Sequence, residues 1–279
     1  MRTRNPYLLI LNFLKYVLLC LGAFACLLPL FWQIRSSFMS MTDIFRLPPI
    51  LFPKSLSLKN YVDVFTMVPF ARYYANTVII VIVNCIGALI SNVSIAYALA
   101  RIDFRGRDLM FALSMGTLML PASVQLIPLF LEWKWLGGIN TFLPLTVPSF
   151  FGNAFFIFLL VQFFRTIPRD YDEAAFVDGA NYPRIIVQLM LPMAKPAITV
   201  VLIFQFMFSW NDFMAPLIFL NDNDLYTLAL GLRTFISTFY TPWPALMAAA
   251  TLTVAPLILL FFLAQKQFIA GITMGGLKG

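Results

Sequence analysis

The sequence contains no histidine, and this absence removes several kinds of chemistry at once. Serine–histidine and cysteine–histidine catalysis, HExxH zinc sites and histidine proton relays all need an imidazole. The three cysteines, Cys20, Cys26 and Cys85, lie inside apolar runs and form neither a CxxC pair nor a metal-ligand spacing. We therefore expect this chain to have no catalytic residue, no metal site and no bound cofactor.

Charged residues are also scarce. They make up 11% of the 279 residues, whereas hydrophobic residues make up 61%. Soluble domains carry about 25% charged residues, so this chain has too few to cover a surface that faces water. The formal net charge of +7 does not indicate a nucleic-acid partner, because the basic residues are scattered in short segments between apolar runs. The composition predicts a protein that lies in a lipid bilayer.

Long apolar runs are abundant, and a membrane helix needs roughly 20 consecutive apolar residues. Because the runs are continuously apolar rather than alternating, we expect helices and not a β-barrel. A cleavable signal peptide is the less favoured interpretation of the first run, since it is long and no small-residue cleavage pattern follows it. The fold class is therefore all-α, a single polytopic membrane domain over residues 1–279. The predicted transmembrane helices are six: Tyr16–Ile34, Tyr74–Ala100, Leu109–Leu131, Phe142–Phe164, Ala197–Leu220 and Trp243–Ala264.

Lysine and arginine predict the orientation, because cytoplasmic loops carry an excess of them. If both termini are cytoplasmic, the inner segments hold 12 of the 19 basic residues, and most of the others fall in the long segment between the first two spans. Long segments count less in this rule than short ones. We expect a multi-pass protein of a bacterial or archaeal cytoplasmic (inner) membrane, with a cytoplasmic loop at 165–196 and a cytoplasmic tail at 265–279.

The predicted cytoplasmic loop has the local signals of a short helix that ends in a tight turn. Pro168 suits a first helical position, and Asp170 followed three residues later by Glu173 resembles a capping box. Either start gives a helix with an acidic first turn that runs through Val177. Gly179 stands where a left-handed residue ends a helix.

A second helix is predicted after the turn. Asn181 can cap its first turn, and we expect Leu191–Pro192 to end it. The small residues Ala174, Ala175 and Ala180 flank the turn, so the surface of another protein could approach the backbone closely. These signals fit a docking site and an amphipathic hairpin resting on the lipid headgroups equally well.

One string in this loop resembles a family signature. Glu173-Ala174-Ala175-x-x-Asp178-Gly179-Ala180, followed by Leu191-Pro192 and Pro196, is similar to the EAA motif of permease subunits of ATP-binding-cassette (ABC) importers. The resemblance implies a type I importer permease (MetI-like) fold, whose coupling helix docks into a groove on a separate ATPase. Glu173 would then make polar contacts at the groove, the alanines would allow close packing, Gly179 would permit the turn, and Asp178 would cap or pair locally. The implied ATPase-coupling residues are Asp172, Glu173, Ala174, Ala175, Asp178, Gly179 and Ala180.

Two further segments resemble the sugar-importer branch of that family. Ser209-Trp210-Asn211-Asp212-Phe213 through Phe219-Leu220 is similar to its maltose-type second permease, and the glycine-rich end Phe268–Gly279 looks like the tail of that branch. The resemblance implies a transport subunit that is not an enzyme and that carries a sugar or oligosaccharide. Its implied partners are a second permease subunit, two ABC ATPase subunits that bind ATP and magnesium, an extracytoplasmic solute-binding protein and the lipid bilayer.

Polar residues inside the apolar runs are candidates for the substrate pathway. Polar groups at bilayer depth are costly and usually face the interior of a helix bundle. A sugar pathway needs neutral hydrogen-bonding groups, although packing between helices is the favoured explanation for any single one of them. The candidates are Asn84, Asn92, Asn153, Gln205, Ser209, Trp210, Asn211 and Asp212.

Asp212 leaves one alternative function open. An intramembrane acid could couple protons in a secondary transporter, which typically shows several such charges and an internal repeat. The sequence shows one such acid, no basic partner for it within the span, and no visible repeat. We therefore expect Asp212 to have an outer-gate or structural role, and an ion-coupled secondary transporter is the alternative.

Overall fold

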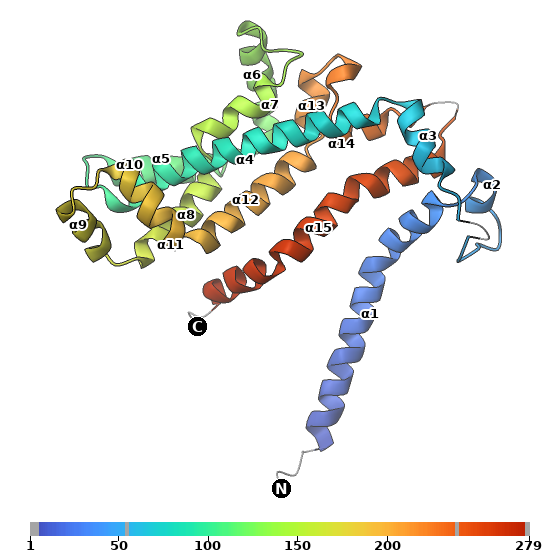
Figure 1. The fold of residues 1–279 in the computed structure, drawn as a ribbon, viewed down its shortest axis with the longest axis horizontal. Coiled ribbons are helices and arrows are strands. Elements are labelled where there is room, and N and C mark those ends of the chain that lie inside the picture. Colours follow the sequence, from blue (N-terminus) through green and yellow to red (C-terminus); the bar gives the residue numbers. More distant parts are fainter. Residues whose placement is uncertain (1–5, 54–55, 238–239, 277–279) are drawn as a thin grey trace. The chain divides into compact units, whose positions relative to one another are not determined.

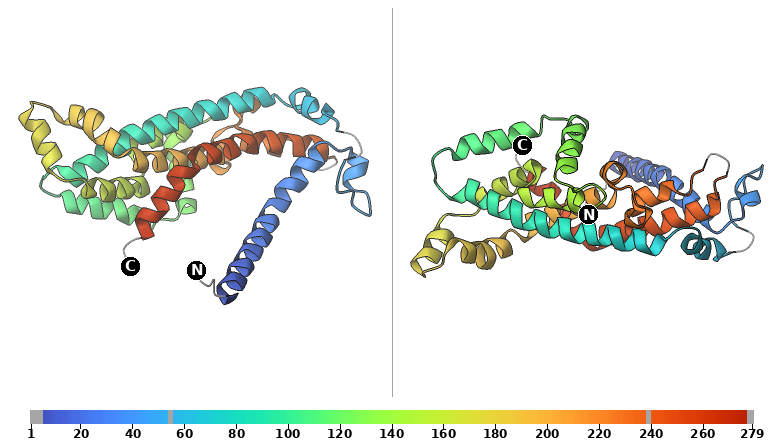
Figure 2. Two further views of the ribbon diagram at one scale, coloured as in Figure 1. Left: turned by 60° about the horizontal axis from the view of Figure 1, so that its bottom comes forward. Right: turned by 90° about the horizontal axis from the view of Figure 1, so that it is seen from above.

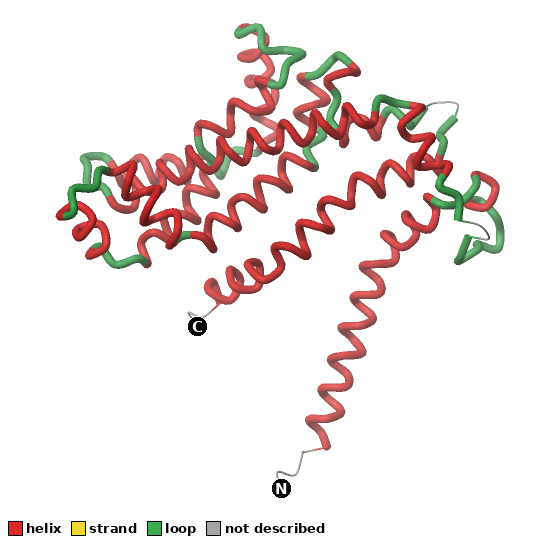
Figure 3. The backbone as a smooth tube through the Cα atoms, in the orientation of Figure 1, coloured by secondary structure: helices red, strands yellow, loops and turns green. Residues whose placement is uncertain are grey.

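The computed structural model describes residues 6–53, 56–237 and 240–276. Within these ranges every element is helical and no strand occurs (Figure 3). The elements, most of which are labelled in Figure 1, are α1 (Pro6–Ser37), α2 (Met41–Ile44), α3 (Lys59–Met67), α4 (Phe70–Arg101), α5 (Arg107–Thr117), α6 (Ala122–Trp135), α7 (Leu143–Thr146), the 3-10 helix η1 (Val147–Phe151), α8 (Ala154–Thr166), α9 (Asp170–Val177), α10 (Tyr182–Ile185), the π-helical η2 (Ile186–Met190), α11 (Leu191–Met193), α12 (Lys195–Trp210), α13 (Met214–Phe219), the 3-10 helix η3 (Asn223–Leu225), α14 (Leu228–Arg233) and α15 (Trp243–Gly276).

The chain divides into two compact units, each of which is described by itself. The first contains residues 1–68 and 234–255, and so takes α1–α3 with the first part of α15. The second contains residues 69–233 and 256–279, and so takes α4–α14 with the rest of α15. Every residue proposed above for ATPase coupling or for the substrate pathway falls in the second unit.

In the first unit, the segment after α1 folds back onto the end of that helix. Asn60 Nδ2 donates to the carbonyl oxygens of Ser37 and Met39 at 2.8 and 3.0 Å. The Ser37 and Tyr61 hydroxyls lie 2.7 Å apart, and Arg35 Nε donates to the Ile50 carbonyl at 2.7 Å. The predicted outer segment between the first two spans is therefore folded into short helices held against the end of α1, and it is not an open loop.

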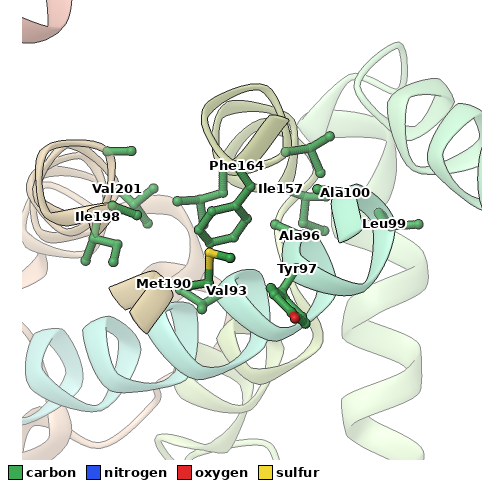
Figure 4. Packing of buried hydrophobic residues seen from close by; sticks show 14 of the residues in the cluster. Val93, Ala96, Tyr97, Leu99, Ala100, Ile157, Phe164, Met190, Ile198 and Val201 are labelled. Atoms are coloured by element: carbon green, nitrogen blue, oxygen red, sulfur yellow. The ribbon is translucent and has the colours of Figure 1, made fainter. Parts of the chain in front are cut away.

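In the second unit, α4, α8 and α12 lie side by side in each view (Figures 1 and 2). Their shared core buries Val93 and Tyr97 of α4, Phe164 of α8 and Val201 of α12. Met190 of η2 reaches into the same cluster (Figure 4). The loop at 165–196 is thus anchored by apolar burial to the helices on both sides of it.

Helix α4 shows why these sequences pack as a membrane bundle. Its exposed face carries Ile79, Ile82, Ile86 and Ile90, each at least 50% exposed. Its buried face carries small and polar residues such as Asn84, Gly87, Ser91 and Asn92. The apolar face turned outward and the polar face turned inward are what a bilayer favours, because each polar group then finds a partner inside the protein.

The predicted spans are only partly continuous helices. Among the described residues, four helical segments are long and apolar enough to cross a membrane: Leu11–Ser37, Phe70–Arg101, Leu143–Thr166 and Trp243–Gln265. A fifth is added if Tyr182–Met193 and Lys195–Trp210, which meet at 87°, count as one bent span. The all-α membrane fold is therefore supported, whereas the count of six stays a prediction.

Three predicted spans are interrupted, and one of them, Phe142–Phe164, forms α7, η1 and α8 with a break at Gly152–Asn153. The run Leu109–Leu131 forms α5 and α6, separated by a turn before Pro121, since a proline disfavours helical geometry in the residue before it. The run Ala197–Leu220 forms α12 and α13, separated at 211–213. The predicted tail at 265–279 is also different, because α15 continues to Gly276, and residues 277–279 lie outside the described part of the chain.

Candidate functional site

The loop predicted to be cytoplasmic forms the expected helix and left-handed turn. Helix α9 ends at Val177, and Gly179 has a φ of +77°. The Ala180 N–H donates to the Ala175 carbonyl at 2.9 Å, and the Gly179 N–H donates to the Phe176 carbonyl at 3.0 Å. This pair of bonds is the Schellman motif, in which the left-handed residue lets the chain satisfy the last free carbonyls of a helix. The expectation for Gly179 is confirmed.

The start of α9 differs from the prediction. The helix begins at Asp170, after Pro168, and its N-cap is Arg169, which makes no side-chain cap bond. The Asp172 and Glu173 N–H groups are satisfied instead by the Arg169 carbonyl, at 2.9 and 3.1 Å. The capping box expected from Asp170 and Glu173 is therefore absent, because the backbone of Arg169 already follows the helical path.

The second helix starts as predicted and ends later. Asn181 Oδ1 accepts the Arg184 N–H at 3.1 Å, so Asn181 is the N-cap. Pro192 does not end the helix, which continues through η2 and α11 to Met193. Proline lacks an N–H and clashes with the carbonyl four residues before it. The wider π-helical turn of η2, where the Leu191 N–H bonds the Ile186 carbonyl, accommodates Pro192 without a break.

Asp172 faces the interior of the protein. It is 7% exposed, and its Oδ1 accepts a hydrogen bond from the Tyr97 hydroxyl at 2.9 Å. Its Oδ2 lies 3.5 Å from Arg101 Nε, in a contact whose side chains are 3% and 11% exposed. Buried charges need such partners, so Asp172 fastens α9 to the end of α4. We proposed Asp172 as an ATPase-coupling residue, and the structure places it behind the surface that a partner would touch.

The exposed surface of the loop carries the other predicted coupling residues. Glu173, Ala174, Asp178 and Gly179 are exposed, whereas Ala175 and Ala180 are half-buried against the core. Three apolar side chains that the motif did not identify share this surface: Tyr171 is 47% exposed, Phe176 43% and Val177 88%. Large exposed apolar groups next to polar ones are typical of a protein-interaction surface.

Six of the eight predicted pathway residues line one cavity in the second unit. The cavity has a volume of about 330 Å³ and lies where α4, α12, η1 and the start of α8 meet. Its volume falls within the range of small-molecule sites, about 300–1,000 Å³. The lining residues are Asn84, Ala88, Asn92, Leu145, Pro148, Ser149, Gly152, Asn153, Gln205, Phe208, Ser209 and Asp212.

The Ser209 hydroxyl is the centre of the polar wall of this cavity. Asn84 Nδ2 and Gln205 Nε2 both donate to Ser209 Oγ, at 3.0 and 2.9 Å. A hydroxyl has two acceptor lone pairs, so the Ser209 O–H remains to donate. Asn84 also donates to the Leu145 carbonyl at 3.0 Å, and its Oδ1 is buried and finds no partner among the described residues. The wall therefore offers the Ser209 hydroxyl as a donor to a hydroxylated ligand, whereas Asn84 Oδ1 lies behind the cavity surface.

A second amide pair fixes the start of α8 beside the cavity. The Asn153 N–H donates to Asn92 Oδ1 at 2.7 Å, and Asn92 is fully buried. Asn153 Oδ1 caps α8 by accepting the N–H groups of Phe155 and Phe156. Both asparagines therefore have an observed packing role, and both also line the cavity.

The last three pathway candidates, Trp210, Asn211 and Asp212, differ in where they lie. Trp210 is buried and stacks on Phe206 with ring centroids 5.3 Å apart, and Asn211 is exposed; neither lines the cavity. Asp212 lies in the break between α12 and α13, and its Oδ1 accepts the Ala215 N–H at 3.2 Å. Irregular backbone at membrane depth is tolerated where it lines a cavity, which is the position of Asp212.

Comparison with known proteins gives consistent matches. The family model described as "Binding-protein-dependent transport system inner membrane component" matches residues 92–273. An arabinooligosaccharides transport system permease protein of Halalkalibacterium halodurans is 33% identical over 97% of this chain and 98% of that protein. A trehalose/maltose transport system permease protein of Thermococcus litoralis is 33% identical over 95% and 98%. A chain in the crystal structure of a bacterial ABC transporter that imports the acidic polysaccharide alginate is 25% identical, with a TM-score of 0.86 over 95% of this chain and 99% of that chain.

Proposed function

The chain belongs to the family of binding-protein-dependent transport system inner membrane components, and we propose that it forms half of the translocation pathway of an ABC importer for a sugar or oligosaccharide. Sugar and oligosaccharide permeases are its relatives over nearly the whole chain. Family membership favours this function over the ion-coupled secondary transporter that the sequence left open.

The observation that carries the proposal is the double role of α4. Asn84 and Asn92 of this helix line the polar cavity, and Tyr97 and Arg101 of the same helix hold Asp172 of the loop. At 1.5 Å per residue, Asn92 and Tyr97 are about 7.5 Å apart along the helix axis. A displacement of the loop therefore moves a cavity wall, which is the linkage that ATP-driven alternating access requires.

The partners follow from the family and the exposed loop surface. We assign the surface of Glu173, Ala174, Phe176 and Val177 to an ATPase subunit, with ATP and magnesium bound in that partner and not in this chain. A second permease subunit completes the pathway, and an extracytoplasmic solute-binding protein delivers the sugar. In this arrangement the loop and both termini are on the cytoplasmic side of the cell membrane.

The cavity favours a neutral sugar. Among the described residues that line it, the one ionisable carboxylate is Asp212, and neither lysine nor arginine is present. An acidic sugar would meet this carboxylate without a counter-charge from this subunit, and like charges repel. Neutral hydroxyls match the amides of Asn84 and Gln205 and the hydroxyl of Ser209. The discriminating experiment is a ligand screen on the cognate solute-binding protein, in which neutral oligosaccharides bind and uronic-acid oligosaccharides do not.

Co-purification tests the ATPase assignment. Val177→Asp places a charge on the exposed loop surface, and a hot-spot loss of about 2 kcal/mol raises the Kd for the ATPase about thirtyfold, so less ATPase is recovered. Val62→Asp is the matched control, because Val62 is 61% exposed on α3, in the predicted outer segment. Equal ATPase recovery with both variants would contradict docking at this surface.

The turn supplies an independent test. Gly179→Pro cannot adopt the φ of +77° and removes the N–H that bonds the Phe176 carbonyl, so ATP-driven uptake is lost. Gly179→Asn tolerates the left-handed conformation and retains most of the uptake. If a chain with Gly179→Pro still transports and never binds an ATPase subunit, the importer function fails.

A further inference from the structure

A second cavity lies beside the loop and is lined mainly by arginine. Its volume is about 570 Å³. Four of its lining residues are arginines, and they come from α4, α5, α8 and the segment before α9. The lining residues are Ala100, Arg101, Arg107, Arg165, Ile167, Pro168 and Arg169.

The cavity lies at the ends of membrane helices. Arg101 is the last residue of α4, and Arg165 lies in the last turn of α8. Both helices belong to segments long and apolar enough to span a bilayer. Arg107 is the first residue of α5. The arginines are therefore at the level where the chain leaves the hydrocarbon, which is the level of lipid headgroups.

Carboxylates neutralise only part of this charge. Asp103 pairs with Arg107 at 2.6 Å and with Arg169 at 3.1 Å, and Asp108 lies 3.3 Å from Arg107. Asp172 is next to Arg101. The Arg165 guanidinium lies over the Phe111 ring, 5.5 Å from its centroid, and has no carboxylate within ion-pair distance among the described residues. Three carboxylates thus contact the four guanidinium groups, and Arg165 is the one arginine of the lining without a carboxylate contact among the described residues.

The buried arginine in this wall is incompletely satisfied. The Arg101 side chain is 3% exposed, and its Nε and Nη2 are buried without a hydrogen-bond partner among the described residues. The contact with Asp172 Oδ2, at 3.5 Å, brings the charges together without hydrogen-bond geometry. A buried guanidinium is always charged and needs acceptors for its N–H groups. Nε and Nη2 are themselves closed to solvent, so Arg101, which lines the cavity, contributes its positive charge to the cavity wall.

We propose that this cavity binds a phosphate group, either the headgroup of an anionic lipid or a free phosphate. A phosphate carries several acceptor oxygens in a compact tetrahedron, and guanidinium groups bind it through paired hydrogen bonds. Arg101, Arg165 and Arg169 approach the cavity from three segments, as a many-oxygen ligand requires. Because Arg101 also holds Asp172, the bound phosphate stabilises the position of the loop.

Removal of one arginine tests the site. Arg165→Gln deletes a cavity charge without depriving a carboxylate of its partner, so it is less disruptive than a change at Arg101. The matched control is Arg184→Gln, an exposed arginine of α10 whose Nε binds Gln188 Oε1 at 2.9 Å away from the cavity lining. The full chain of each variant is placed in nanodiscs of phosphatidylcholine with phosphatidylglycerol, and retained lipid is counted by native mass spectrometry after transfer to detergent. A second arm titrates inorganic phosphate against the detergent-solubilised chain and follows ³¹P line broadening.

The expected result is specific to the cavity. The natural chain and Arg184→Gln retain phosphatidylglycerol over phosphatidylcholine, and Arg165→Gln retains about fivefold less, as expected for one arginine near an anionic headgroup. Phosphatidylglycerol retention without phosphate broadening identifies a lipid, and broadening that Arg165→Gln removes identifies a free phosphate. Equal losses in both variants, or no preference in either arm, overturn the proposal. A result in which Arg165→Gln lowers only the recovery of the ATPase also overturns the proposal.

Discussion

The Tyr97 hydroxyl donates a hydrogen bond to Asp172 Oδ1 across 2.9 Å, although the two residues are 75 positions apart in the chain. Tyr97 is 1% exposed and Asp172 7%, so water does not compete for this bond. The bond joins the middle bundle helix α4 to the loop helix α9. The loop is thus fastened to the bundle by a polar contact as well as by the apolar core, and its movement and that of α4 are coupled.

Removing the Tyr97 hydroxyl tests this fastening. Tyr97→Phe leaves Asp172 Oδ1 buried without a donor, which costs about 1–3 kcal/mol of unfolding free energy. We expect a lower thermal unfolding midpoint in detergent and a larger fall in ATP-driven uptake than in ATPase binding. The control is Tyr182→Phe, because Tyr182 is 46% exposed and contacts Phe176 through its ring. Matching losses in the two variants would show that the hydroxyl bond to Asp172 has no special weight.

The contact between α4 and η1 depends on Gly87. A Cβ at this position would lie 2.4 Å from Ser149 Oγ and 2.8 Å from the Phe150 ring. Gly87→Ala therefore forces η1 away from α4 and costs about 1–3 kcal/mol, the usual cost of overpacking. Gly116→Ala in α5, where no atom lies within 4 Å, gains up to about 1 kcal/mol from helix propensity. Opposite shifts of the two unfolding midpoints are the expected result, and a stabilised Gly87→Ala would contradict the close packing.

The polar cavity predicts different effects for two neighbouring side chains. Gln205 lines the cavity, whereas Asn211 is exposed outside it and bonds the Met207 carbonyl at 2.8 Å. Gln205→Ala removes one neutral hydrogen-bonding group and raises the KM of sugar uptake up to about tenfold, which corresponds to 0.5–1.5 kcal/mol. Asn211→Ala leaves the KM within about twofold. Uptake of radiolabelled sugar by vesicles containing the complete importer measures both, and the reverse order would move the pathway elsewhere.

Asp103 predicts a pH dependence at the arginine-lined cavity. The hydrogen bond from Arg169, followed by the charges of Arg169 and Arg107, lowers the pKa of the Asp103 carboxyl below its ordinary value of 3.8. A carboxyl whose pKa is lower in the folded state stabilises it at pH values above 3.8, and that contribution is lost as the pH falls through the folded pKa. The contact between Asp103 and Arg169 therefore persists throughout the neutral pH range. In Arg169→Gln the carboxyl pKa rises toward its ordinary value, as measured by carbon-13 NMR of the aspartate carboxyls, and in Arg105→Gln it stays low.

The sequence predicted two features that depend on local chemistry, although the local signals for a capping box at Asp170 and for a helix end at Pro192 were wrong. The turn at Gly179 and the cap at Asn181 each follow from side chains within four positions, so composition and spacing suffice to place them. The polar residues of the apolar runs also gathered as expected, since bilayer depth leaves them few places other than the bundle interior. The exceptions, Trp210 and Asn211, flank the end of α12, where helical spacing no longer decides which way a residue faces.

The contacts between distant segments could not be predicted. Asp172 was predicted only as an ATPase-coupling residue, and its contacts with Tyr97 and Arg101 depend on folding that brings distant segments together. The breaks at Pro121 and at 211–213 were concealed by continuous hydrophobicity, which measures length in the bilayer but not helix continuity. The arginines at the ends of α4 and α8 had been explained as a topology signal, and their convergence on one cavity depends on how the bundle packs.

The bend between the loop and α12 determines how a movement of the loop would be transmitted to α12. The segments Tyr182–Met193 and Lys195–Trp210 meet at 87°. Ala194, at the corner, is fully buried, and its N–H bonds the Met190 carbonyl at 2.8 Å while its own carbonyl accepts the Ile198 N–H at 2.9 Å. Because the backbone hydrogen bonds at this corner are intact, the two segments are held at a fixed angle. In the proposed importer, an ATPase that displaces the loop segment would therefore tilt α12, and Gln205 and Ser209, near the other end of α12, would move further than Ala194.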